Sequence, residues 1–139
     1  MNWIAYTLIS TFFFGFWGLF SKLASKYISY TSIFIYECFV FFIAGAIIFI
    51  ITGCRVEVNF FGVSYSILYG LSGLIATFCF IIAISNGSVS LITAITATYP
   101  CITMILAYYF LHENITLKQI LGTILVILGI FLLGLGADI

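Results

Sequence analysis

Residues 58–112, VNFFGVSYSILYGLSGLIATFCFIIAISNGSVSLITAITATYPCITMILAYYFLH, contain no Asp, Glu, Lys or Arg over about 55 positions. A helix of about 20 apolar residues crosses the hydrocarbon core of a membrane, so this stretch is long enough to cross it twice. Near its middle, Asn86-Gly87-Ser88 is a strong turn signal, and Ser88 or Ser90 can cap a following helix. The stretch therefore predicts two transmembrane helices, at about 61–85 and 89–111.

The rest of the chain repeats this pattern on both sides. Apolar segments at about 3–21, 31–52 and 117–134 predict three further helices, and the last begins at a Thr116–Gln119 capping box. The loop at 53–59 holds the only cluster of opposite charges. We therefore predict an all-α membrane protein, a bundle of five transmembrane helices in a single domain over residues 1–139. An odd number of helices leaves the two termini on opposite sides of the membrane.

The composition excludes several other classes of protein. Hydrophobic residues make up 65% of the 139 residues and charged residues 6%, against about 45–50% and 25% in soluble domains. Formal net charge is zero and no basic run occurs, so we expect lipid as the partner and no nucleic acid. The N-terminus lacks the basic region and cleavage site of a signal peptide. We read the first helix as retained, and the absence of a targeting signal favours the bacterial cytoplasmic membrane.

Catalytic and metal-binding patterns are missing from the sequence. His112, the one histidine, lies in a predicted loop and lacks the second histidine of a zinc helix. The four cysteines are widely spaced and form no C-x-x-C pair, so they are read as small buried hydrophobes. We expect neither an enzyme, nor a cofactor, nor a metal site.

Glu37 is the only acidic residue well inside a predicted helix, about six residues or ~9 Å past the helix start. An ionised carboxylate there costs about 3 kcal/mol on insertion scales, so it should face the bundle or a wet cavity. Ala44 and Gly45 share its helix face and suit close packing. Desolvation favours the neutral acid, which would suit reversible proton binding. The alternatives are a protonated structural glutamic acid and a side chain that reaches the headgroups.

Other polar and aromatic residues are weaker candidates for a solute pathway. Lys22, at the end of the first helix, either snorkels to the interface or pairs with Glu37. Trp17, Tyr36, Asn86 and Tyr99 could line a pathway with ring faces or hydrogen bonds.

Backbone and packing signals occur in the second half of the chain. Pro100, the sole proline, lies mid-helix and should kink the helix at 89–111. Gly122 and Gly129, seven residues apart, form a small-residue face. That face either packs within one bundle or forms a dimer seam.

Six short motifs occur in a fixed order along nearly the whole chain. They are Gly15-Phe16-Trp17-Gly18-Leu19-Phe20-Ser21-Lys22, Tyr36-Glu37, Ala83-Ile84-Ser85-Asn86-Gly87-Ser88-Val89-Ser90, Tyr99-Pro100, Leu111-His112-Glu113, and Gly122 through Gly129. Together they resemble the EamA-like domain of the drug/metabolite transporter superfamily, in its short five-helix form. The chain departs from the family pattern at Phe14, where tryptophan is usual, at Ser21 and Ser88, where prolines are common, and at Asn114, where a basic residue often follows the glutamate.

The resemblance implies secondary transport or export of metabolites, amino acids or drug-like compounds. It also implies that longer relatives contain two such halves in inverted orientation. Physical reasoning agrees, because a second copy fused after an odd number of helices begins on the opposite side. This sequence holds one copy, so we predict that two copies pair as an antiparallel homodimer. The substrate is expected to be a small molecule.

The leading interpretation is a proton-coupled or facilitative transporter in which Glu37 exchanges a proton for solute. Two alternatives stay open: a non-transporting membrane subunit in a hetero-complex, in which Glu37 serves packing, and a lipid-linked sugar flippase subunit.

Overall fold

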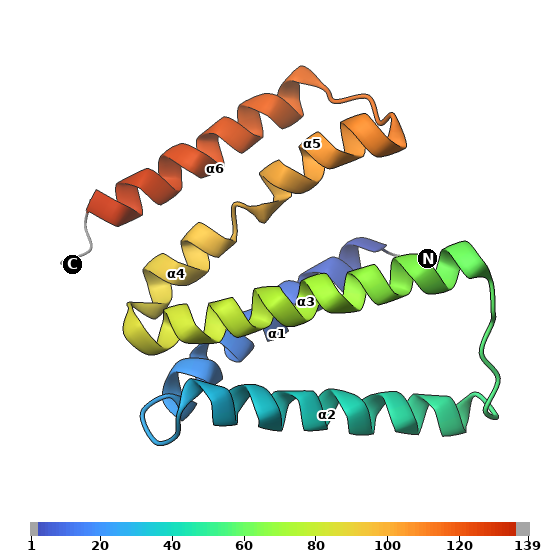
Figure 1. The fold of residues 1–139 in the computed structure, drawn as a ribbon. Coiled ribbons are helices and arrows are strands. Elements are labelled where there is room, and N and C mark those ends of the chain that lie inside the picture. The colour runs from blue at the N-terminus through green and yellow to red at the C-terminus, as the bar shows by residue number, and fades with distance from the viewer. Residues whose placement is uncertain (1–2, 136–139) are drawn as a thin grey trace. The chain divides into compact units, whose positions relative to one another are not determined.

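The computed structural model describes residues 3–135, and this part of the chain is built from helices (Figure 1). In chain order they are α1 (Trp3–Ala24), α2 (Tyr30–Ile51), α3 (Phe60–Asn86), α4 (Val89–Thr96), α5 (Tyr99–Leu111) and α6 (Leu117–Leu135).

Five segments of the described chain are long and apolar enough to cross a membrane, as predicted. Four of them are single helices, and the fifth, Val89–Leu111, contains α4 and α5. Each span begins and ends within a few residues of its predicted bounds. Away from its ends, a helix satisfies its backbone hydrogen bonds within one segment, which hydrocarbon requires because it offers no other partner.

The chain divides into two compact units, residues 1–86 and residues 87–139. The N-terminal unit contains α1, α2 and α3, and the C-terminal unit contains α4, α5 and α6. In the N-terminal unit α3 contacts both α1 and α2, and in the C-terminal unit α4 contacts α6.

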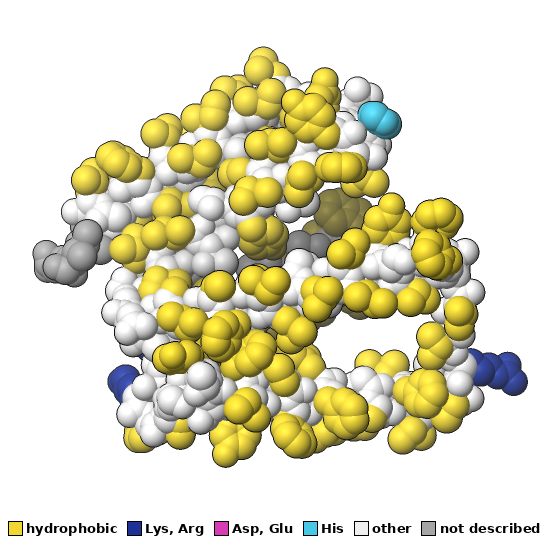
Figure 2. All heavy atoms as spheres, viewed as in Figure 1, with side chains coloured by type: hydrophobic (Ala, Val, Ile, Leu, Met, Phe, Trp, Pro, Cys, Tyr) yellow, Lys and Arg dark blue, Asp and Glu magenta, His cyan; other side chains and the backbone are white. Residues whose placement is uncertain are grey.

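The three helices of the N-terminal unit are packed at one end. Its buried residues belong to the second half of α1, the start of α2 and the last turns of α3; they are Gly18, Ser21, Ile33, Phe80, Ile81 and Ile84. Towards the other end the residues are exposed, and Figure 2 shows open space between α2 and α3 near the loop that joins them. Hydrophobic side chains cover these surfaces, as expected for helices that face lipid.

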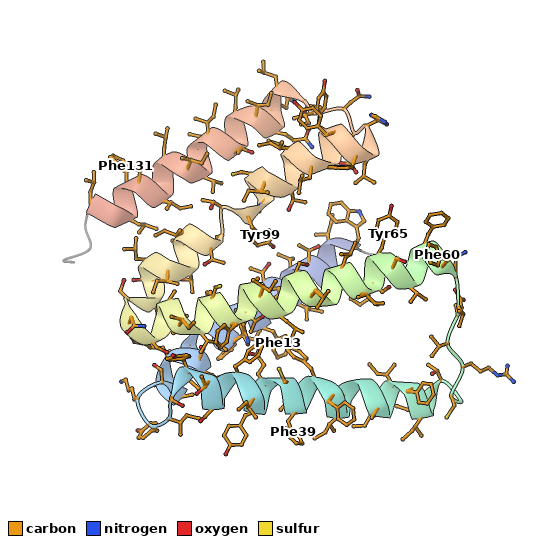
Figure 3. The ribbon with its side chains drawn as sticks, viewed as in Figure 1. Phe13, Phe39, Phe60, Tyr65, Tyr99 and Phe131 are labelled. Carbon is orange, nitrogen blue, oxygen red and sulfur yellow. The ribbon has the colours of Figure 1, made fainter. Side chains whose placement is uncertain are left out.

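Outward-pointing aromatic rings illustrate this surface. Phe39 on α2 points away from α3, while Phe60 and Tyr65 on α3 point away from α2 (Figure 3). All three are at least 63% exposed. In water such a surface would aggregate, whereas in a bilayer the rings contact lipid.

Local hydrogen bonds cap the starts of α2 and α3 and the end of α2. The Ser29 hydroxyl accepts from the backbone N–H of Ser32 and caps α2, and Asn59 Oδ1 accepts from Gly62 N–H and caps α3. At the other end of α2, Gly53 and Cys54 both have positive φ, 69° and 59°. This left-handed pair lets Cys54 N–H donate to Phe49 O and closes the helix.

Pro100 lies where the fourth span is interrupted. The sequence predicts a kink within one helix, whereas the structure has a break between two helices. α4 ends at Thr96, four residues before the proline, and α5 begins at Tyr99. The cause is the proline itself: it has no N–H to donate to the Thr96 carbonyl, and its ring would clash with that oxygen in a continuous helix. The Thr98 N–H and hydroxyl both donate to Ile95 O and close the end of α4.

The turn between α5 and α6 joins two capping motifs. His112 adopts the left-handed conformation with φ 54°, which ends α5. Thr116 and Gln119 then form the predicted capping box, in which Thr116 N–H donates to Gln119 Oε1 and Gln119 N–H donates to Thr116 Oγ1. Ser88 occupies the N-cap position of α4, although its hydroxyl makes no capping hydrogen bond.

Candidate functional site

Three helices meet at the packed end of the N-terminal unit. The chain runs along α1, turns, returns along α2 and turns again into α3, so the end of α1, the start of α2 and the end of α3 lie together. Two of the predicted site residues, Trp17 and Glu37, lie in this region and are half-buried.

A hydrogen bond joins these two residues. Trp17 Nε1–H donates to Glu37 Oε1 at 2.7 Å, across 20 positions of sequence. This distance lies at the short end of the range for N–H···O hydrogen bonds in proteins. The indole therefore supplies a polar partner to the only acidic side chain within the described spans.

The same indole contacts α3. Its ring stacks on Phe80, with ring centroids 4.5 Å apart and an angle of 13° between the planes. Phe80 is 8% exposed and lies on the helix that contacts both α1 and α2. Trp17 thus touches α2 through its N–H and α3 through its ring face.

Lys22 lies further along α1 and contacts the end of α3. Its Nζ donates to Ile84 O at 2.7 Å. The last four carbonyls of a helix lack partners within the helix, and a cation is favourable beside them. The structure therefore gives Lys22 a capping contact on α3, and the pairing of Lys22 with Glu37 stays a prediction.

The other predicted pathway residues take no part in the Trp17–Glu37 hydrogen bond. Tyr36 is 65% exposed and precedes Glu37 on α2. Asn86 donates from Nδ2 to Ile82 O of its own helix, at 2.7 Å. Tyr99 belongs to the C-terminal unit, where it is 61% exposed at the start of α5.

The residues predicted to share the face of Glu37 are also outside the packed end. Ala44 and Gly45 are exposed, and a Cβ added at Gly45 would meet no atom within 4 Å. In the N-terminal unit the close packing of α2 is therefore confined to its first turns, around Ile33 and Glu37.

Two residues of this region could not be assigned to the site from the sequence. Phe80 is one of 16 phenylalanines, and nothing in its sequence context singles it out. Ser21 stands out in the sequence only as a departure from the family pattern. Its spacing offers a signal, because Trp17, Gly18, Ser21 and Lys22 recur at the intervals that place residues on one face of a helix.

Ser21 is the buried polar residue of the described chain, 6% exposed, and its hydroxyl has no hydrogen-bond partner. Other hydroxyls in the spans donate to a carbonyl of their own helix, among them those of Thr7, Thr11, Ser64, Ser66, Ser85, Thr93 and Thr103. Burying a hydroxyl without a partner costs about 1–3 kcal/mol.

We therefore expect Ser21→Ala to stabilise the fold by about 1 kcal/mol, because it removes a buried group that makes no hydrogen bond. Thermal unfolding in detergent, followed by circular dichroism, measures the change. Ser85→Ala is the matched control, since the Ser85 hydroxyl donates to Ile81 O and its loss should leave stability unchanged or lower. A lower unfolding temperature for Ser21→Ala would contradict this expectation, because it would show that the hydroxyl stabilises the fold.

Metal or cofactor chemistry finds no support among the described residues. They contain no group of three or more His, Cys, Asp or Glu side chains that could hold a metal ion. All four cysteines are free. A shallow hollow of about 330 Å³ on α2 is lined by Cys38, Phe39 and Phe42, which offer no charged group to a solute.

The family model that matches this sequence is that of the EamA-like transporter family, over residues 1–135. The match covers α1 to α6 and so includes Trp17, Glu37 and Lys22. The chain belongs to the EamA-like transporter family. The family consists of membrane transporters of small solutes, and no enzymatic activity follows from it.

A curated relative of this EamA-like chain is an uncharacterised protein of Methanocaldococcus jannaschii, 32% identical over 72 residues. The aligned region is 52% of this chain and 53% of the relative, so the chain matches about half the length of that protein. No solved structure is significantly similar to the chain. The family, the five spans and the apolar surface together make it a multi-pass membrane protein.

Proposed function

We propose that this EamA-like chain is a secondary transporter that moves a small solute in exchange for protons, with Glu37 as the proton-binding group. The hydrogen bond between Trp17 and Glu37 carries this proposal. It gives the acidic side chain of the described spans a polar partner on a neighbouring helix. A carboxyl group can bind and release a proton during a transport cycle.

The position of Glu37 supports the same role. It lies about two turns into α2, at the packed end of the N-terminal unit, and is half-buried. A carboxylate at such a position is costly in a membrane and is usually found where it contacts a solute or ion pathway. A purely structural contact to Trp17 could be made by a neutral glutamine at lower cost.

We further propose that residues 1–139 act as one transmembrane domain and pair with a second, inverted copy. Transporters built from inverted repeats bind solute between the repeats, so one copy supplies one wall of the pathway. α6 has a face that suits such pairing. Within the C-terminal unit, a Cβ added at Gly122 or Gly129 would meet no atom within 4 Å, so this small-residue face is open to another helix.

An antiparallel pair requires molecules in both orientations, and the charge distribution favours this. Lys22 and Lys26 lie at one end of the predicted spans and Arg55 and Lys118 at the other, two against two. We expect a single-cysteine variant that keeps Cys54 to react with an impermeant reagent in about half of the molecules of sealed membrane vesicles, since two orientations would be equally populated. Adding two arginines to the 53–59 loop should give one orientation. A uniform orientation of the unmodified chain would contradict the antiparallel homodimer.

The experiment that tests the transport function can be run before the substrate is identified. The purified chain is reconstituted into liposomes that contain a pH-sensitive dye, a pH gradient is imposed, and candidate metabolites, amino acids and organic cations are added one at a time. A transported solute should dissipate the gradient in proportion to its concentration, and empty liposomes are the control. Solute uptake without any proton movement would contradict proton exchange. Transport that appears only with a co-purified second membrane protein would favour a hetero-complex.

A further inference from the structure

We propose that Trp17 transmits the protonation state of Glu37 to α3 through its stack on Phe80, which makes Trp17 a positioning residue in the coupling step. This inference rests on the proposed function, in which Glu37 binds the transported proton. It adds a physical connection between proton binding and a movement of the helices.

The connection depends on the two contacts of one rigid indole. The Nε1–H bond lies in the plane of the ring and points to Glu37 Oε1 at 2.7 Å. The face of the same ring lies on Phe80, with a centroid separation of 4.5 Å and an interplanar angle of 13°. Because the N–H cannot turn without turning the ring, a change at the carboxyl group changes the stack.

Protonation changes the hydrogen bond in a defined way. A carboxylate only accepts hydrogen bonds, whereas the neutral acid has one O–H donor of its own. The indole N–H is a donor and cannot accept from that O–H. Its bond to the neutral acid is therefore weaker, by about half, than its bond to the carboxylate. Proton binding weakens the hydrogen bond that holds the indole. The O–H of the neutral acid can then donate to another acceptor.

Phe80, the partner of Trp17 in the stack, lies in the most buried part of α3. Phe80 is followed by Ile81, which is 1% exposed, and by Ile84 one turn later, which is 0% exposed. Close-packed side chains cannot absorb a displacement locally, so they pass it to the backbone that carries them. Lys22 Nζ donates to Ile84 O. The last turns of α3 therefore contact α1 at two residues, Phe80 and Ile84.

The remaining titratable groups around Glu37 are few. At the packed end, α1 carries Lys22, α2 carries Tyr36 and Cys38 beside Glu37 in the sequence, and α3 carries Cys79 next to Phe80. α3 carries no Asp, Glu, Lys, Arg or His between Phe60 and Asn86. A proton-dependent signal at Trp17 therefore has Glu37, which accepts its N–H, as its nearest source.

Tryptophan fluorescence tests the first half of the connection, because the chain has only two tryptophans. Trp3→Phe leaves Trp17 as the sole indole. Its emission, excited where tyrosine does not absorb, is followed in detergent and in liposomes as the pH is lowered. We expect one reversible titration of intensity and emission maximum in Trp3→Phe and its complete loss in Trp3→Phe/Glu37→Gln.

A matched control replaces a glutamate outside the spans. Glu57 lies in the loop between α2 and α3, so Trp3→Phe/Glu57→Gln should titrate as Trp3→Phe does. A Trp17 signal that does not change with pH, or one that persists in the Glu37→Gln variant, would overturn the proposal.

A dye on α3 tests the second half of the connection, from Trp17 through Phe80 to α3. Cys79 is exposed and adjacent to Phe80, so an environment-sensitive dye is attached there after the other three cysteines are replaced by serine. We expect the dye to report the Glu37 titration, and Phe80→Leu to abolish that report while Trp17 emission still titrates. A dye signal that is unchanged by Phe80→Leu would show that the stack does not carry the change.

Transport assays separate this inference from the proposed function. Trp17→Phe should lower gradient-driven accumulation about tenfold, and counterflow by the same variant is measured beside it to separate a loss of coupling from a loss of transport. If Trp17 and Cys79 respond to Glu37 but no solute moves protons, the proposed function fails and the connection stands. If transport is proton-coupled but insensitive to Trp17→Phe, the connection fails alone.

Discussion

Glu37→Gln is expected to abolish accumulation of solute driven by a proton gradient, while counterflow of the same solute stays measurable. For one proton exchanged per solute, each unit of pH gradient supports about tenfold accumulation, because one unit corresponds to 1.36 kcal/mol. A glutamine cannot titrate, so the accumulation ratio should fall to about one. Counterflow needs exchange but no net driving force, and it therefore survives if the site is otherwise intact.

The substitution is suited to this question because it preserves the local structure. The glutamine side chain has the size of glutamate and keeps a carbonyl oxygen, which can still accept from Trp17 Nε1–H. Folding should be unaffected or improved, since the variant no longer places an ionisable group inside a span.

The measurement compares variants in liposomes at equal protein content, with an imposed gradient and with counterflow as paired assays. Glu57→Gln and Glu113→Gln are the matched controls, because both glutamates lie in loops outside the spans and should transport normally. Unchanged gradient-driven accumulation in Glu37→Gln would assign this residue to structure alone.

Pro100→Ala is the second substitution with a large expected effect. It restores an N–H that can donate to Thr96 O and removes the ring that would clash with that oxygen, so α4 and α5 can join into one helix. The amount of folded protein should stay the same or rise, because a proline inside a helix costs about 3 kcal/mol.

Transport should nevertheless decrease about tenfold. Alternating access requires two arrangements of the helices that have similar free energy. Bending of the fourth span at Ala97 and Thr98 would allow one arrangement to convert into the other. A bias of ~1.4 kcal/mol towards one arrangement changes the populations by about a factor of ten. This role of the break is a proposal that the assay tests directly.

Hydrogen exchange at residues 96–99, together with uptake at matched protein levels, provides the measurement. Cys101→Ala is the control, because it alters the next side chain and leaves the proline in place. Slower exchange with normal uptake in Pro100→Ala would show that the break is a packing feature without a part in transport.

The sequence by itself was sufficient for the spans and their ends. Hydrocarbon demands about 20 apolar residues in each helix, and the turn and capping signals at Asn86-Gly87-Ser88 and Thr116–Gln119 depend on neighbours a few positions apart. The break near Pro100 is equally local, because the missing N–H and the clash both involve Thr96, four residues earlier. Glu37 could also be singled out, since a charge inside an apolar span is costly wherever the span packs.

Only the tertiary structure decided which side chains touch. Trp17 and Glu37 are 20 residues apart and Lys22 and Ile84 are 62 apart, so their contacts depend on how α1, α2 and α3 are rotated about their axes. Apolar residues occur on every side of α2, so apart from Glu37 its sequence does not show which side meets a neighbour. For the same reason neither the stack on Phe80 nor the buried hydroxyl of Ser21 could be foreseen. Hydrophobicity places a helix in the membrane, but the packing of individual side chains sets its rotation.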